Sequence, residues 1–153
     1  KQMSKICQIH MSCCDINNDI VENLSNVMKS GYLHELLQLD LSMNGITLEG
    51  MKFLMSGLNQ SNTPNVEVLN LSGNAVGDLG INVLTSFILL GSFKNLVNLD
   101  ISYNHGTTCI IHLARAIHQN CCPYLTDLGI AGNFPPQVKP TQLFRNALKV
   151  VSK

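Results

Sequence analysis

Four asparagines each close a near-copy of one short phrase. The phrases LDLSMN, LNLSGN, LDISYN and LGIAGN end at Asn44, Asn74, Asn104 and Asn133. The steps between these positions are 30, 30 and 29 residues, and one more step of 30 back from Asn44 reaches Cys14, at the end of IHMSCC. A fixed period of this length is typical of stacked units that each contact only their neighbours. We therefore expect a solenoid. The repeat period predicts the shape of such a protein but says little about which ligand it binds.

Each unit predicts a strand, a sharp turn and a helix. Apolar residues alternate before the asparagine, as Leu69 and Leu71 do, and the apolar period changes towards 3.6 after it. Thr47 is expected to cap the helix of its unit, and Gly31 to end the helix before it. The apolar stripes expected to face the core are Ile20, Leu24, Val27 and Met28; Met51, Leu54, Met55 and Leu58; Leu79, Val83, Leu84 and Phe87; Ile110, Leu113, Ala114 and Ile117.

The recurring asparagine has a physical reason. The backbone turns sharply after each strand and leaves peptide groups that neither sheet nor helix satisfies. An inward carboxamide offers donors and an acceptor to those groups, so we predict a structural ladder of Cys14, Asn44, Asn74, Asn104 and Asn133. Cys14 bonds weakly, and the first unit is therefore expected to be looser.

The phrase Val66-x-x-Leu69-x-Leu71-x-x-Asn74 resembles the leucine-rich repeat, and the helix-bearing form with a Cys or Asn turn is similar to the ribonuclease-inhibitor type. The resemblance extends from Ile6 to about Val151. It implies an α/β horseshoe segment: a right-handed coil of about five repeats, with a parallel concave sheet and convex helices. It also implies protein binding, as in ribonuclease inhibitor, the sensor ends of nucleotide-oligomerising immune receptors, tropomodulin-like actin cappers and GTPase-activating solenoids. The residues do not choose among these branches.

The repeats predict one domain over 1–153, with units at roughly 6–35, 36–65, 66–95, 96–124 and 125–153. The last unit breaks at Phe134-Pro-Pro136, but Leu143, Phe144, Ala147, Leu148 and Val151 keep helical spacing and predict a capping helix. Little chain precedes the first strand, which leaves a bare edge that solenoids normally cap. We expect the segment to be the C-terminal part of a longer solenoid.

Composition restricts the partner classes. The formal net charge is +0 and the six Lys and Arg residues between Lys52 and Lys149 are scattered, so we expect no nucleic-acid partner and no electrostatic membrane contact. The longest apolar run, Val83 to Leu90, is far too short to span a bilayer. Four of the six cysteines form adjacent pairs, Cys13-Cys14 and Cys121-Cys122, and this spacing does not match a secreted disulfide framework. Reduced thiols in a cytoplasmic or nuclear protein are expected.

Alignment of the units places three rows of side chains on the outer face of the sheet. The predicted partner-binding residues on these rows are His10, Gln38, Asp40, Met43, Val68, Asn70, Asn98, Asp100, Tyr103 and Asp127. Tyr103 is the expected anchor, Met43 an adaptable apolar contact, and Asp40 and Asp100 the charges that give specificity. The alternative is that these residues are simply solvated and that binding occurs elsewhere in the parent protein. Ser12, Ser42, Ser72 and Ser102 form a further row that we interpret as structural.

Catalysis and metal binding are not expected. Asp40 and Asp100 stand two strands apart, about 10 Å at the usual strand spacing, which is too far to act together on one bond. Cys109, His112, His118, Cys121 and Cys122 resemble zinc ligands by type. The repeat register, however, matches Cys109 and His112 to Glu49 and Lys52, on an outward helix face. We expect no cofactor.

These observations favour a non-enzymatic module that binds another protein through a rigid, curved sheet face. Two alternatives remain: a purely structural repeat segment, and a regulatory or sensor region of an immune receptor or GTPase-regulating protein whose chemistry lies in other domains. The sequence does not predict the oligomeric state or the identity of the partner.

Overall fold

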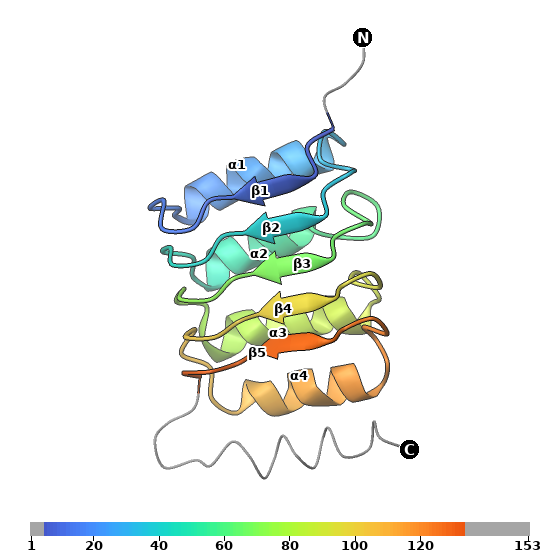
Figure 1. The fold of residues 1–153 in the computed structure, drawn as a ribbon. Coiled ribbons are helices and arrows are strands. Elements are labelled where there is room, and N and C mark those ends of the chain that lie inside the picture. The colour runs from blue at the N-terminus through green and yellow to red at the C-terminus, as the bar shows by residue number, and fades with distance from the viewer. Residues whose placement is uncertain (1–4, 134–153) are drawn as a thin grey trace.

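The computed structural model describes residues 5–133, and strands and helices alternate throughout this range (Figure 1). The elements are β1 (Gln8–His10), α1 (Asn18–Lys29), β2 (Gln38–Asp40), α2 (Leu48–Gly57), β3 (Val68–Asn70), α3 (Gly77–Leu89), β4 (Asn98–Asp100), α4 (Cys109–His118) and β5 (Asp127–Gly129). All neighbouring strands are parallel and stack in chain order. The helices form a second layer behind the sheet (Figure 1).

The sheet register reproduces the sequence period. Leu39 lies opposite Leu69, Leu69 opposite Leu99, and Leu99 opposite Leu128. The first three of these leucines are completely buried, and each contributes on the order of 1.5–3 kcal/mol through burial. Leu41, Leu71 and Ile101 form a second buried row beside them. The alternating leucines therefore form one continuous core that runs the length of the stack.

The predicted helix stripes are confirmed in part. All four residues predicted for α2 are buried, but Ile20 is 41% exposed and Val27 is 43% exposed. These two predictions are wrong for a positional reason. Gly50 and Gly80, at the positions equivalent to Ile20, are buried between successive helices, whereas no described helix packs on the outer side of α1.

A third error concerns α3. Leu79 was expected to face the core, but it is 65% exposed. The buried residues of this helix are Ile81, Leu84, Thr85 and Ile88, at spacings of three and four residues, together with Gly80. Leu79 falls outside this stripe because the inward-facing side of α3 is rotated relative to the side that the sequence pattern indicated.

The start of α2 is capped from the preceding repeat rather than by the predicted residue. Thr47 is the N-cap residue of α2, but its side chain makes no capping bond. The Oδ1 atom of Asn18, at the start of α1, accepts instead from the backbone N–H groups of Thr47 (3.1 Å) and Gly50 (3.0 Å). A Cβ built on Gly50 would lie 2.4 Å from this Oδ1, so glycine makes room for the contact. The prediction for Gly31 fits better: it follows α1 with φ +83°, as a glycine after a helix commonly does.

The predicted capping helix around Leu143 to Val151 lies outside the described residues. Among the helices of residues 5–133, none combines the length and the apolar character that a membrane crossing requires.

Candidate functional site

The asparagine ladder joins each turn to the turn before it. The Nδ2 group of Asn74 donates to the carbonyls of Leu41 (3.0 Å) and Leu71 (2.9 Å), and its Oδ1 accepts from the N–H of Ile46 (3.1 Å). Asn44 makes equivalent bonds, including one from the N–H of Cys14 (3.0 Å). Each carboxamide therefore satisfies backbone groups of two adjacent repeats.

The ladder is not uniform. Asn104 is fully buried and donates to three carbonyls, but its Oδ1 atom has no partner among the described residues. The adjacent turn differs there, because the N–H of Gly77 bonds the backbone carbonyl of Asn104 instead. Cys14 is exposed, and its thiol contacts only the carbonyl of Ser12 within its own turn. The asparagine side chains therefore stabilise the fold by bonding the turns together, whereas the Cys14 side chain takes no part in these bonds.

The central row of the sheet face consists of His10, Asp40, Asn70, Asp100 and Gly129, one residue per strand. Its acidic and amide members share a local hydrogen bond. The Oδ1 atoms of Asp40, Asn70 and Asp100 accept from the N–H two residues later, that of Ser42, Ser72 or Ser102, at 2.8 to 3.1 Å. The hydroxyls of Ser42 and Ser72 donate to the same oxygens. The serine row thus completes turns, while one side of each carboxylate stays half-exposed.

The neighbouring row consists of Gln8, Gln38, Val68, Asn98 and Asp127. Its two end members are exposed and the three central ones are half-buried. The structure therefore brings the predicted strand residues together on one side of the sheet, away from the helices. Asp40 and Asp100 lie on β2 and β4, with β3 between them.

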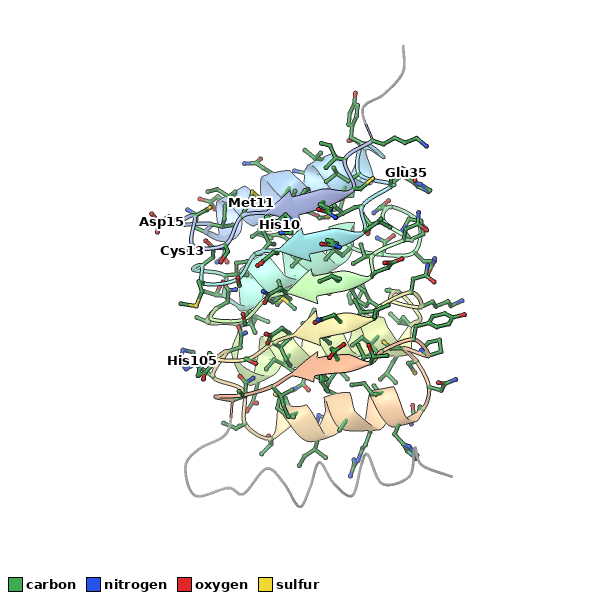
Figure 2. All side chains as sticks on the ribbon, in the orientation of Figure 1. His10, Met11, Cys13, Asp15, Glu35 and His105 are labelled. Carbon is green, nitrogen blue, oxygen red and sulfur yellow. The ribbon has the colours of Figure 1, made fainter. Side chains whose placement is uncertain are left out.

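The third row lies just past the strand ends, immediately before each ladder residue, and we call it the rim row. Its members are Cys13, Met43, Gly73, Tyr103 and Gly132, with φ of +55°, +54°, +68°, +55° and +69°. Figure 2 shows Cys13 at the same edge of the sheet as Asp15 and His105, with Glu35 at the opposite edge. The left-handed backbone is therefore common to all five turns, although only glycine adopts it without strain.

The rim row alternates bulky residues with glycine. Met43 is 62% exposed and Tyr103 is 63% exposed. A Cβ on Gly73 would lie 2.3 Å from Sδ of Met43, and a Cβ on Gly132 would lie 2.3 Å from Cδ1 of Tyr103. Each bulky side chain therefore rests over the glycine of the next repeat. Both keep most of their surface exposed to solvent.

The sequence pattern missed Asp78, which lies in the first turn of α3. Its Oδ1 accepts from the N–H of Thr107 (2.6 Å), and the Thr107 hydroxyl donates to its Oδ2, so Asp78 stabilises the start of α4. Partial burial alone would raise the Asp78 pKa, but hydrogen bonds from Cys109 and Thr107 lower it to about 2. The sequence held a signal for this role: Asp78 lies two repeats after Asn18, and Asn18 stabilises the start of α2 in the same way.

In the fourth unit His112 is exposed on the outward helix face, as predicted, but Cys109 does not lie where it was predicted. Cys109 was matched to an outward helix face, but it is 1% exposed, and burial beside the Asp78 carboxylate raises its pKa to about 12. Cys122 is also buried, and burial with the nearby Cys121 raises its pKa to about 11. His112 and His118 are exposed. Across residues 5–133, no three potential ligands gather in a metal-binding group, and all six cysteines are free thiols.

Comparison with known proteins agrees with this geometry. A family described as "Leucine Rich repeat" matches residues 33–55 and 63–84, which contain β2 with most of α2 and β3 with most of α3. The fold is a leucine-rich-repeat solenoid. The expected fold class is therefore confirmed. No curated protein matches the sequence.

A solved structure supports the same leucine-rich-repeat fold over most of the chain. Leiomodin-1 actin-binding site 2 superimposes with a TM-score of 0.71 and 16% sequence identity, over 94% of this chain and 79% of that one. Identity this low concerns the fold alone.

Proposed function

We propose that this leucine-rich-repeat segment is a non-enzymatic module that binds another protein through the sheet face and the rim row. The observation that carries the proposal is the presence of Met43 and Tyr103 at left-handed turn positions. The same turn is made by glycine in two other repeats, so neither bulky residue is needed to form it. A left-handed Met or Tyr costs on the order of 1–2 kcal/mol, which exposed side chains hardly recover by packing. A contact with a partner would explain why these two turns carry bulky side chains despite the cost.

Their chemistry suits a protein partner. Tyrosine offers a large rigid surface with a polar tip and is enriched at binding hot spots, and methionine adapts to irregular apolar surfaces. The solenoid holds both on a fixed scaffold, so little conformational entropy would be lost on binding. The solved neighbour is itself described as an actin-binding site, which supports a binding role without identifying this chain's partner.

We also propose that the repeats are of the ribonuclease-inhibitor type and belong to one domain that is the C-terminal part of a longer intracellular solenoid. An α-helix in each of four successive repeats supports the type. The first repeat supports the extension, because Ile20 is exposed on α1 although the equivalent Gly50, Gly80 and Ile110 are all buried. A preceding repeat would cover this apolar surface.

Affinity capture from cell extract tests the proposed face. Met43→Gly and Tyr103→Gly each install the residue that Gly73 already provides at the same turn position, so the fold should be retained. We expect proteins captured by the wild-type segment to be lost from the double variant. If the double variant captures the same proteins in the same amounts, the proposal is wrong.

The convex surface of α3 is a second candidate. Leu79 is 65% exposed and Leu90, at the end of the same helix, is 78% exposed. Other repeats carry Glu49 and Gln60 at these positions. Leu79→Glu with Leu90→Gln is therefore the matched control. Loss of capture with this variant alone would move the binding site to the helices.

A further inference from the structure

The charges of this chain are unevenly distributed along its sequence, and residues 5–133 are acidic. All ten Asp and Glu residues lie within residues 5–133, but only five of the ten Lys and Arg residues do. The part of the chain that the structure describes therefore carries a formal excess of five negative charges. The net charge of +0 is reached only with the ends of the chain.

Part of this excess of negative charge lies on the sheet face. Asp40, Asp100 and Asp127 lie on strands, and no Lys or Arg occurs in any of the five strands. The carboxylate of Asp100 leans over Gly129, where a Cβ would lie 2.3 Å from its Oδ1, which brings the charge towards β5 and Asp127.

The basic residues of the described range do not neutralise this face. Lys5 lies 3.9 Å from Glu35 and Lys52 lies 2.7 Å from Glu49. The other three, Lys29, Lys94 and Arg115, lie on helices or in the connection before β4. None forms a salt bridge with an acid of the strands among the described residues.

The turns do not require the charges of Asp40 and Asp100. Asn70 accepts the backbone bond that both of them accept, from Ser72 N–H at 3.1 Å, and the hydroxyl bond that Asp40 accepts, from Ser72 Oγ at 2.8 Å. Asn98 occupies the same row as Asp127, on the adjacent strand. An amide thus makes the turn bonds of the central row and also occurs in the row of Asp127, so the charges of these carboxylates are available to a partner.

We propose that the partner of the sheet face is a basic protein segment, which places Lys or Arg side chains on Asp40, Asp100 and Asp127. This proposal rests on the proposed function and specifies the chemistry of the partner. Cations would form charge-assisted hydrogen bonds with the exposed oxygens of these carboxylates. The exposed ring of Tyr103, at the end of β4, offers a cation–π surface beside them. Complementary charge would also accelerate and orient the encounter.

Two synthetic peptides of equal length test the proposal: one alternates lysine with alanine and serine, and the other carries glutamate in place of lysine. Binding is measured by titration calorimetry, and the contact surface is mapped by amide chemical shifts. We expect the lysine peptide alone to bind, to shift amides of β2 to β5, and to weaken as salt rises. Asp40→Asn, Asp100→Asn and Asp127→Asn together should reduce its affinity at least about tenfold.

The matched control removes the same charge from the helix layer, with Asp19→Asn, Glu22→Gln and Glu49→Gln. This variant should keep the affinity of the wild type within about threefold, since exposed charges on another face contribute little to peptide binding. The inference is overturned if the lysine peptide does not bind, if the glutamate peptide binds equally well, or if the two variants weaken binding equally.

Capture of native partners separates this inference from the proposed function. Partners lost from the Met43→Gly, Tyr103→Gly variant but fully retained by the three-Asn variant would leave the sheet-face function standing and reject a basic partner. Partners retained by the rim variant would reject the function itself.

Discussion

Replacement of Asn74 by alanine tests the ladder in the middle of the stack. Asn74 is 3% exposed, and its carboxamide makes three bonds of 2.9 to 3.1 Å with Leu41, Leu71 and Ile46 and a longer one of 3.4 Å to the Ser72 carbonyl. Each neutral bond contributes about 1 kcal/mol net, and buried backbone groups left without a partner cost about 1–3 kcal/mol each. Since the turn can relax only in part, we expect Asn74→Ala to lower the free energy of unfolding by about 3–5 kcal/mol.

Urea unfolding followed by circular dichroism measures this loss. Asn95→Ala is the control, because half-buried Asn95 donates a single bond to the Pro64 carbonyl (3.0 Å) and should cost less than about 1.5 kcal/mol. Asn74→Asp keeps the volume and the acceptor but removes both donors, so it should destabilise as much as alanine. A loss below about 1 kcal/mol in either Asn74 variant would refute the ladder argument.

Three further substitutions and one labelling experiment have expected outcomes. Leu71→Ala should cost about 2–5 kcal/mol in urea melts, because Leu71 lies in the continuous core; a loss below about 1 kcal/mol would contradict that position. The lowered pKa of Asp78 means that its carboxylate stabilises the fold above pH 4, and that this contribution is lost as pH falls from about 4 towards 2. Asp78→Asn should therefore flatten the acid limb of the stability profile, and an unchanged limb would disprove the role. Gly132→Ala should destabilise more than Gly77→Ala, since both glycines have positive φ but only Gly132 has Tyr103 above it. Cys109 should react with a thiol reagent at pH 8 far more slowly than exposed Cys13, as mass spectrometry of the labelled sites would show.

The repeat period predicted most of the fold because register and burial both follow from it. Leu39, Leu69 and Leu99 lie opposite one another, as steps of 30 residues require. The helix faces were less predictable. Helix α3 carries apolar residues on both its inward and its outward side, so periodicity alone did not distinguish inward Ile81 from outward Leu79. Comparison with Glu49 and Asp19, one and two repeats earlier, would have indicated that position 79 faces solvent.

The candidate site was predictable as a set of rows but not in its energetics. Alignment of the repeats placed Met43 and Tyr103 in one row with Gly73 and Gly132. The two glycines in that row are themselves a sign of positive φ. The buried position of Cys109 and the cap supplied by Asp78 depend on contacts between α3 and α4, and no pattern within a single repeat encodes them.

Site-specific crosslinking tests whether a protein partner binds at the rim row and sheet face. A photoreactive phenylalanine derivative is placed at Tyr103 in one variant and at Leu79 on the outer side of α3 in another, and both are irradiated in cell extract. We expect a discrete covalent adduct from position 103 that is absent from position 79. An adduct from position 79 with none from position 103 would contradict this expectation.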